Sequence, residues 1–362
     1  MEFITFQKPN LNYIFFIAYF ISIFLKETLE YEIFGENPLK SQNLFKMYVF
    51  NLSHILSIIP FFISKYLSKN KPKNKEQKNE ENPITYIHND ISNKFKGNNL
   101  LKNTLLTSIF GFLSEAVVNI FYFINDKSQI YYFHELNIYL IFECVFIYII
   151  SVFILKSYFY KHHYLSLFIN FICFSADFIF DIIKIVQEEI TEYQYYIYIA
   201  IRLIRQILLG YMDCYAKLAM HEAFISPYSL LVFRAIYENL FLIIYTVPFI
   251  FINIEDLDGT NEIIFKGFLN YLNGIKILYS ILYFINVYLR NLFIIYIIDK
   301  FSPSHYTLAM TLEAICKNAD RIIKSNIDDK EVDWDKYANC GIFLILFIAS
   351  MIHNEIFIIN KC

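Results

Sequence analysis

The chain has 362 residues, of which 57% are hydrophobic, 19% aromatic and only 18% charged, and its formal net charge is −3. An average globular domain is about 45–50% apolar and about 25% charged, so a soluble fold has too small an interior for this much apolar surface. The charge balance also offers no basic patch of the kind that nucleic-acid binding requires. We therefore predict an all-α integral membrane protein in the lipid bilayer that does not bind nucleic acid.

The apolar segments predict about ten transmembrane helices, because roughly 20 apolar residues cross the hydrocarbon core as a helix. The segments are residues 12–26, 44–66, 103–125, 136–155, 164–186, 195–219, 228–252, 275–298, 303–325 and 338–359. The first lacks a small-residue cleavage site, so we interpret it as a retained helix and not as a signal peptide. Residues 68–102 are rich in Lys, Asn and Glu, a composition typical of a flexible, solvated loop.

The charges of the connecting loops predict the orientation of the chain. The second, fourth, sixth and eighth loops are basic, whereas the first, fifth and seventh lean acidic. By the positive-inside rule both termini then face the cytoplasm, from either an endomembrane or the plasma membrane. Ser226-Pro227 and Ser302-Pro303 each have the pattern of a helix start. Ten helices fit two five-helix halves, residues 1–186 and 187–362, of which the second would be inverted.

Ionisable residues within apolar segments cost about 2.5–3.5 kcal/mol each on insertion scales, so they tend to face the bundle interior and to be functional. The ones within these segments include Glu115, Glu143, Asp177, Asp181, Arg202, Arg205, Asp213, Arg234, Glu238, Lys276, Arg290, Glu313 and Lys317. Arg234 with Glu238, and Glu313 with Lys317, have the i, i+4 spacing of an ion pair on one helix face. Lys317 also begins a basic stripe that either lines a path for an anionic solute or marks the exposed end of a short helix.

Other candidate residues leave alternatives open. Asp177 and Asp181 share a helix face, so either one of them is protonated or an arginine of the next helix pairs with them. His162 and His163 are interpreted as loop residues, and the six cysteines have no CxxC spacing. We expect no metal and no cofactor. The motifs of nucleotide-driven pumps and of hydrolases are missing from the sequence, so we predict that the chain is not an enzyme.

Three stretches of the second half resemble the drug/metabolite transporter superfamily, in particular its EamA-like and nucleotide-sugar-transporter-like members from protists. They are GYMDCYAKLAMHEAFISPYSLLVFRAIYENLF at 210–241, FSPSHYTLAMTLEAI at 301–315 and GIFLILFIASMIHNEIFIIN from Gly341. In that family a Lys near the end of the sixth helix precedes a Ser-Pro, and the last helix ends in an aromatic-Asn-Glu. The matching positions hold Lys217, Ser226, Pro227, Asn354 and Glu355. His353 stands in place of the aromatic residue.

This resemblance implies ten helices in two inverted halves, a central cavity, and alternating access without ATP hydrolysis. It also implies that a basic residue of the ninth helix meets an anionic ligand, for which Lys317 is the nearest counterpart. The glycine-rich helix packing common in the family is scarce here, since the chain has only eight glycines.

We therefore expect a protein similar to a secondary transporter that moves a small polar or anionic organic solute, of nucleotide-sugar or metabolite type. The residues expected to bind the solute are Lys317, Glu313, Arg234, Glu238, Glu115 and Asp177. A homodimer is also considered. The alternative is a non-transporting multi-helix membrane subunit or scaffold, in which the charges pair internally and the centre of the bundle is filled.

Overall fold

The computed structural model describes residues 4–6, 14–34, 40–69, 98–124, 138–187, 192–222, 225–247, 253–255, 261–263, 271–272, 274–327, 334–355 and 357–359. These residues form ten helices when α2 (Lys40–Ser53), the 3₁₀ turn η2 (His54–Ser57) and α3 (Ile58–Lys69) are counted as one. The other nine are α1 (Ile14–Phe34), α5 (Asn98–Ile124), α7 (Ile138–Leu155), α8 (Lys161–Gln187), α9 (Glu192–Glu222), α10 (Pro227–Thr246), α12 (Lys276–Lys300), α13 (Pro303–Ile327) and α14 (Trp334–His353).

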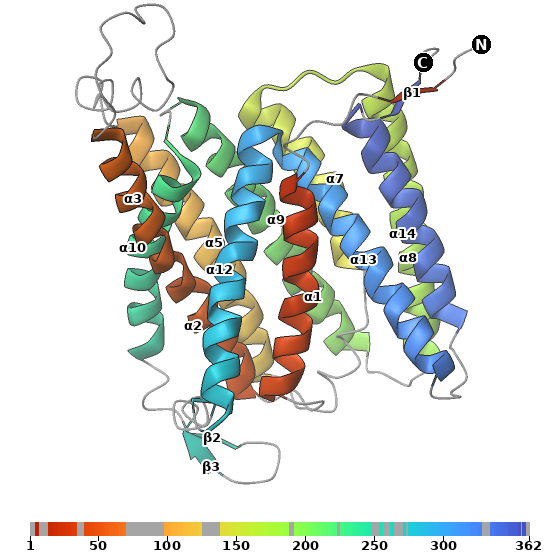
Figure 1. Cartoon of the computed structure of the whole chain (residues 1–362). Coiled ribbons are helices and arrows are strands. Elements are labelled where there is room, and N and C mark those ends of the chain that lie inside the picture. The colour runs from red at the N-terminus through yellow and green to blue at the C-terminus, as the bar shows by residue number, and fades with distance from the viewer. Residues whose placement is uncertain are drawn as a thin grey trace, which may run out of the picture.

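Two short antiparallel strand pairs mark opposite ends of the bundle (Figure 1). Strand β1 (Ile4–Phe6) pairs with β4 (Phe357–Ile359), which brings the two termini together at one end. Strand β2 (Asn253–Glu255) pairs with β3 (Asn261–Ile263) at the other end. We call the end that carries β1 and β4 the terminal end.

Among the described residues, five helices are long and apolar enough to cross a membrane, as expected for an integral membrane protein. They are the segments Leu44–Ser64, Leu100–Ile120, Lys161–Phe180, Pro227–Thr246 and Lys276–Lys300. Their outward faces carry large apolar side chains such as Phe62, Phe168 and Ile244, which are 59%, 63% and 71% exposed. A solvent of lipid explains such exposure, because a soluble surface would show large apolar patches of this kind only at binding sites.

All ten predicted helical segments are present, but three of their C-terminal ends differ from the prediction by six residues or more. The first helix continues past residue 26 to Phe34, through a charged stretch that the apolar pattern did not include. The seventh ends at Thr246 and not at 252. The tenth ends at His353, after which Glu355 takes the left-handed φ of 58° and the chain enters β4. The predicted loop at 68–102 lies largely outside the described residues.

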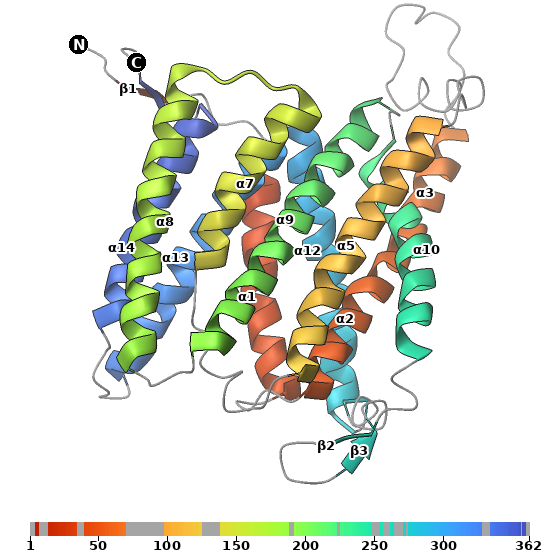
Figure 2. The same cartoon turned by 180° about the vertical axis from the view of Figure 1, so that it is seen from behind.

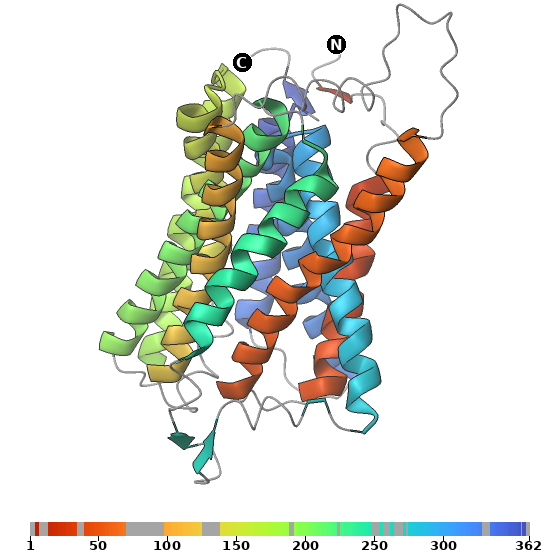
Figure 3. The same ribbon diagram turned by 90° about the vertical axis from the view of Figure 1, so that its left-hand side faces the viewer.

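The second helix is interrupted where Pro60 would disturb it. Proline lacks an amide hydrogen, and its ring clashes with the carbonyl four residues earlier. Here the clash falls on Leu56, and the chain forms the 3₁₀ turn His54–Ser57 in place of a regular α turn. Figure 3 shows this helix, in orange, running obliquely along the edge of the bundle. The turn directs the His54 side chain, which is fully buried, toward α10 and α12.

Helices distant in sequence pack along one another in the centre of the bundle. α5 packs extensively against α9, and α1 against α12, whereas α8 and α14 form a pair at one edge (Figure 2). A large apolar cluster joins α1, α9, α10, α12 and α13 near the terminal end. We call it the terminal cluster, and it includes Tyr19, Ile23, Ala216, Met220, Leu230, Leu231, Leu292, Ile295, Ile298 and Met310.

Gly111 on α5 has a specific packing reason. A Cβ atom at this position would lie 2.9 Å from Nη2 of Arg234, 2.9 Å from Oε1 of Glu238 and 3.1 Å from the sulfur of Met212. Because glycine has no side chain, the buried ion pair of Arg234 and Glu238 on α10 can lie directly against the backbone of α5. At Gly341 on α14, by contrast, an added Cβ meets no atom within 4 Å.

Replacing these two glycines by alanine should have opposite effects on stability. Gly111→Ala forces the ion pair aside, and overpacking of this kind typically costs about 1–3 kcal/mol. Gly341→Ala should be neutral or stabilise the protein by up to about 1 kcal/mol, because alanine is the better helix former. Thermal unfolding of the purified protein in detergent measures both. Equal melting temperatures for the two variants would contradict this packing.

Candidate solute cavity

A cavity of about 340 Å³ lies in the middle of the bundle, and side chains of eight helices line it. Seven of the lining side chains are cationic and five carry carboxyl groups. The cationic ones are Lys26, Lys46, Arg202, Arg205, Arg234, Arg290 and Lys317, and the acidic ones are Glu30, Glu115, Glu143, Asp213 and Glu313. Among the described helices, α8 and α14 contribute no lining residue. So many charges from helices far apart in sequence make a polar site at the centre of an apolar bundle.

Glu30 on α1 is one centre of charge pairing. Its two carboxylate oxygens lie 3.3 Å from Nζ of Lys26 and 2.7 Å from Nζ of Lys46. The hydroxyl of Tyr283 on α12 donates a third contact, at 2.7 Å. Two cations and a phenol around one carboxylate leave a net positive charge on this wall of the cavity.

Glu313 on α13 is the second centre. Nζ of Lys317 lies 2.6 Å from one of its oxygens, and the hydroxyl of Tyr19 donates to the other at 2.9 Å. The same ammonium group lies 2.7 Å from the carboxylate of Glu27. The predicted i, i+4 pair is therefore present, but Lys317 is shared between two acids on α1 and α13. The side chains of Arg321 and Lys324, the rest of the predicted basic stripe, lie outside the described residues.

Arg290 on α12 differs from these paired cations. Its Nη2 donates to the Tyr19 hydroxyl at 3.5 Å, and the guanidinium lies 5.6 Å from the Tyr19 ring centroid. Its Nε is buried without a hydrogen-bond partner, and no carboxylate of the described residues lies within ion-pair distance. A guanidinium offers five N–H donors in a planar fork that fits a carboxylate or a phosphate. Arg290 thus presents unused donors to the cavity.

Arg234 and Glu238 on α10 form a second predicted i, i+4 pair, with 2.7 Å between Nε and Oε1. The other carboxylate oxygen lies 2.7 Å from Nδ1 of His54, whose Nε2 lies 3.0 Å from the amide nitrogen of Asn291. An amide nitrogen can only donate, so Nε2 accepts and Nδ1 carries the hydrogen that Glu238 receives. This buried network fastens the second helix and α12 to α10.

The remaining cavity acids differ in how they are satisfied. Glu115 on α5 pairs with Arg205 on α9, with 2.9 Å between Oε1 and Nη2. Both carboxyl oxygens of Asp213 are buried and have no hydrogen-bond partner among the described residues. Glu143 is only 4% exposed and lies in no ion pair with the other described residues. The cavity therefore contains two acids that lie in no ion pair with described residues, Asp213 and Glu143, together with the N–H donors of Arg290.

Four of the six residues predicted to bind the solute line the cavity: Lys317, Glu313, Arg234 and Glu115. Glu238 is fully buried behind Arg234 and contacts the cavity only through its partner. Asp177 does not join them. It lies on α8 and is 1% exposed, and in the part of the chain that the structure describes neither of its oxygens has a hydrogen-bond partner. Whether the four bind a solute stays a prediction.

Three charged lining residues, Lys26, Glu30 and Lys46, were not among the charges singled out in the sequence. They lie at the ends of apolar segments, where a hydropathy pattern assigns charges to loops. The signal that could have found them is the spacing of Lys26 and Glu30, which is i, i+4 like the two recognised pairs. His54 was missed because no neighbouring sequence feature marks a buried histidine.

The motif residues of the second half have structural partners. Nζ of Lys217 donates to the carbonyls of Asp299 and Phe301 at 2.7 and 3.0 Å and so caps the end of α12. The hydroxyls of Ser226 and Ser302 accept the amides of Ser229 and His305, which confirms both as helix starts.

No family model matches the chain, and no curated protein is similar to it in sequence. The likeness to the drug/metabolite transporter superfamily stays a prediction.

The buried network predicts a large cost for removing Glu238. Glu238→Ala leaves the Arg234 guanidinium buried without its counter-charge, which typically costs about 3–5 kcal/mol. The double variant Arg234→Met with Glu238→Met should recover most of that loss, because it removes both charges. Asp299→Ala, at a partly exposed pair with Lys300, is the control and should cost under about 1 kcal/mol. Thermal unfolding compares the variants, and a Glu238→Ala protein as stable as the parent would rule the network out as a stabilising element.

Proposed function

We propose that the chain is a secondary transporter of the drug/metabolite type, which moves a small anionic organic solute across a membrane by alternating access. In this proposal all ten helices span the bilayer and both termini face the cytoplasm. The solute occupies the central cavity, and Arg290 binds its anionic group. Lys317 and Lys26 add positive charge beside it.

The pattern of helix packing supports two inverted halves. If helices one to five correspond to helices six to ten, the contact of the third with the sixth corresponds to that of the eighth with the first. These are α5 with α9 and α12 with α1, two of the most extensive helix contacts in the bundle. The fifth and tenth helices, α8 and α14, pack against each other, as corresponding helices beside a two-fold axis would.

The position of the cavity supports alternating access. Most of its charges lie in the half of the bundle away from the terminal end, such as Lys26 and Glu30 on the second half of α1 and Arg202 and Arg205 on the first half of α9. The terminal cluster fills the space between the same helices on the terminal side. We infer that this cluster is the closed gate, and that separating its helices would open the cavity toward the termini.

The single observation that carries the proposal is the state of Arg290. A guanidinium among apolar helices is costly unless a partner neutralises it. Five other cations of the cavity lie in ion pairs. Within the described part of the chain, Arg290 directly contacts only the hydroxyl and the ring of Tyr19, and Glu313 acts on it from beyond ion-pair distance. An anionic solute would supply the missing charge through a bidentate contact.

Substitution of Arg290 tests this proposal. A thermal-shift panel of nucleotides, nucleotide sugars, sugar phosphates, carboxylates and polyamines should find an anion that stabilises the parent protein, by about 2.7 kcal/mol at a hundredfold excess over Kd. Arg290→Gln should lose this shift, and Arg290→Lys should keep part of it, since lysine is a point charge without the fork. Lys276→Gln is the matched control, because Lys276 is exposed at the start of the same helix.

A scaffold remains the rival function, and one observation favours it: most cavity cations already have acidic partners. The thermal-shift panel distinguishes the transporter from the scaffold. A ligand shift that depends on Arg290, followed by uptake of that ligand into proteoliposomes, supports transport. A well-folded parent that no anion stabilises, or a shift that Arg290→Gln leaves intact, contradicts the proposed site.

A further inference from the structure

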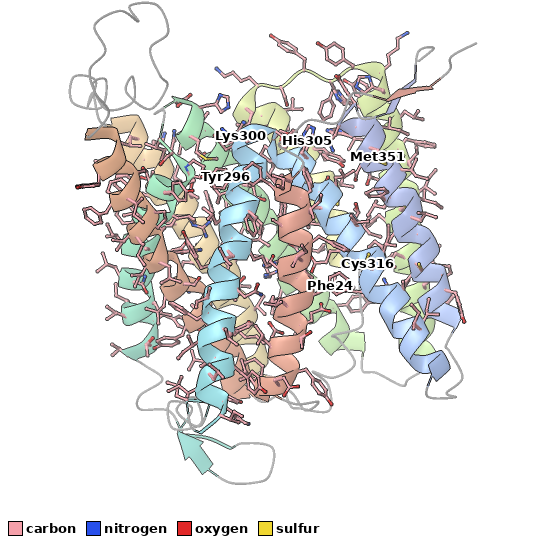
Figure 4. The ribbon with its side chains drawn as sticks, viewed as in Figure 1. Phe24, Tyr296, Lys300, His305, Cys316 and Met351 are labelled. Carbon is pink, nitrogen blue, oxygen red and sulfur yellow. The ribbon has the colours of Figure 1, made fainter. Side chains whose placement is uncertain are left out.

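A second cluster of polar groups lies at the terminal end, outside the cavity and between the first turn of α8 and the residues that follow α14. It consists of His162 and His163 on α8, which are helical and not loop residues as predicted, together with Glu355. One ligand atom from each of the three lies within 4.8 Å of the others. Figure 4 shows the labelled His305 and Met351 at this same end of the bundle.

The ligand atoms are close to the spacing that a metal requires. Nε2 of His162 lies 3.2 Å from Oε1 of Glu355. Zinc binds nitrogen and oxygen at about 2.0–2.2 Å, which puts neighbouring ligands of a tetrahedral site about 3.4 Å apart. The ligand atom of His163 lies within 4.8 Å of the other two, so it has to move closer by on the order of 1 Å for all three to bind one ion. Side-chain rotation can supply such a shift, since these side chains are only partly buried.

The histidines have lone pairs for a metal. Nε2 of His162 is buried without a hydrogen-bond partner, in spite of its proximity to Glu355. Nδ1 of His163 accepts the amide hydrogen of Tyr160 at 2.9 Å, so it too carries a lone pair. Tyr160 is 61% exposed, so water can replace this contact when the lone pair turns to a metal. The His163 ring also donates a hydrogen bond to the backbone carbonyl of His353, and such outer contacts orient the rings of metal-binding histidines.

The chain after α14 is built to hold Glu355 in place. Its φ of 58° is in the left-handed region that non-glycine residues rarely adopt, and its amide donates to the carbonyl of Ile352 at 3.2 Å. The preceding Asn354 donates to the carbonyls of Ser304 and Ser350 at 3.0 and 2.8 Å. The Glu355 carboxylate therefore extends from an anchored turn toward the start of α8.

We propose that His162, His163 and Glu355 bind a divalent transition metal of the zinc class and link α8 to the end of α14. Two imidazoles with one carboxylate are ligands typical of zinc, whereas Mg²⁺ and Ca²⁺ prefer sites built of oxygen alone. The remaining coordination positions are left to water. This site is independent of the central cavity, so it stands whether or not the chain transports an anion.

Metal titration of the full-length chain, purified with an affinity tag that contains no histidine, tests the site. Calorimetry with Zn²⁺ should detect one ion per chain, and Mg²⁺ should not compete. His162→Gln, His163→Gln and Glu355→Gln should each weaken zinc binding by at least about tenfold, as expected for the loss of a direct ligand. His221→Gln, which alters a histidine in the last turn of α9 that is not one of the three ligands, should bind zinc like the parent.

Cobalt spectroscopy makes the result independent of any folding defect. Bound Co²⁺ gives visible absorption whose intensity reports the coordination number, and it is read on the monodisperse fraction of each variant. Glu355→Gln is the decisive variant, because its partly exposed side chain can change without disturbing the core. An absence of zinc binding by the parent, or equal affinity in the parent and all three ligand variants, would overturn the assignment.

Discussion

The central constraint on this structure is the cost of holding charged side chains inside an apolar bundle. Each such charge needs an opposite charge, a set of hydrogen bonds or water. The bundle meets this requirement with ion pairs, some within one helix and others between helices, such as Lys46 with Glu30 and Arg205 with Glu115. The pairs also decide which helices can lie side by side, since each partner must be reached from its own helix.

The same constraint accounts for the helices that fail the criteria for an apolar span. α1, α9 and α13 carry the charges Lys26, Glu30, Arg202, Arg205, Glu313 and Lys317, and all six line the cavity. Their polarity therefore faces inward, while helices such as α8 and α10 present apolar side chains outward. A bundle of this kind has a polar centre and an apolar surface, which is the reverse of a soluble protein.

Much of the helical framework could be predicted, because a helix in a membrane satisfies its own backbone and leaves its apolar length visible in the sequence. The pairs Arg234 with Glu238 and Glu313 with Lys317 were also predictable, since i, i+4 spacing is a local property. Contacts between helices that are distant in the sequence could not be predicted. Nothing local in the sequence joins His54 to Glu238, or Tyr19 to Arg290, and these contacts shape the cavity.

Two groups of residues lie in places that their sequence positions did not indicate. Asp177 was grouped with the cavity because an intramembrane acid is usually functional, yet α8 lies at the edge of the bundle, away from the other charges. His162 and His163 were predicted to lie in a loop, but they belong to the first turn of α8. They were not expected to bind a metal, because the sequence has no second metal-ligand pair at a useful spacing. Glu355, nearly two hundred residues later, comes beside them only when α8 packs against α14.

The most direct test of the account is whether the central cavity opens to each side of the membrane in turn. Val118→Cys places a thiol in the cavity and Ile243→Cys one on the lipid-facing side of α10, both in a background without the six native cysteines. A charged, membrane-impermeant thiol reagent should label residue 118 from either side and residue 243 from neither. Labelling of residue 118 from one side only, or from neither, would contradict alternating access.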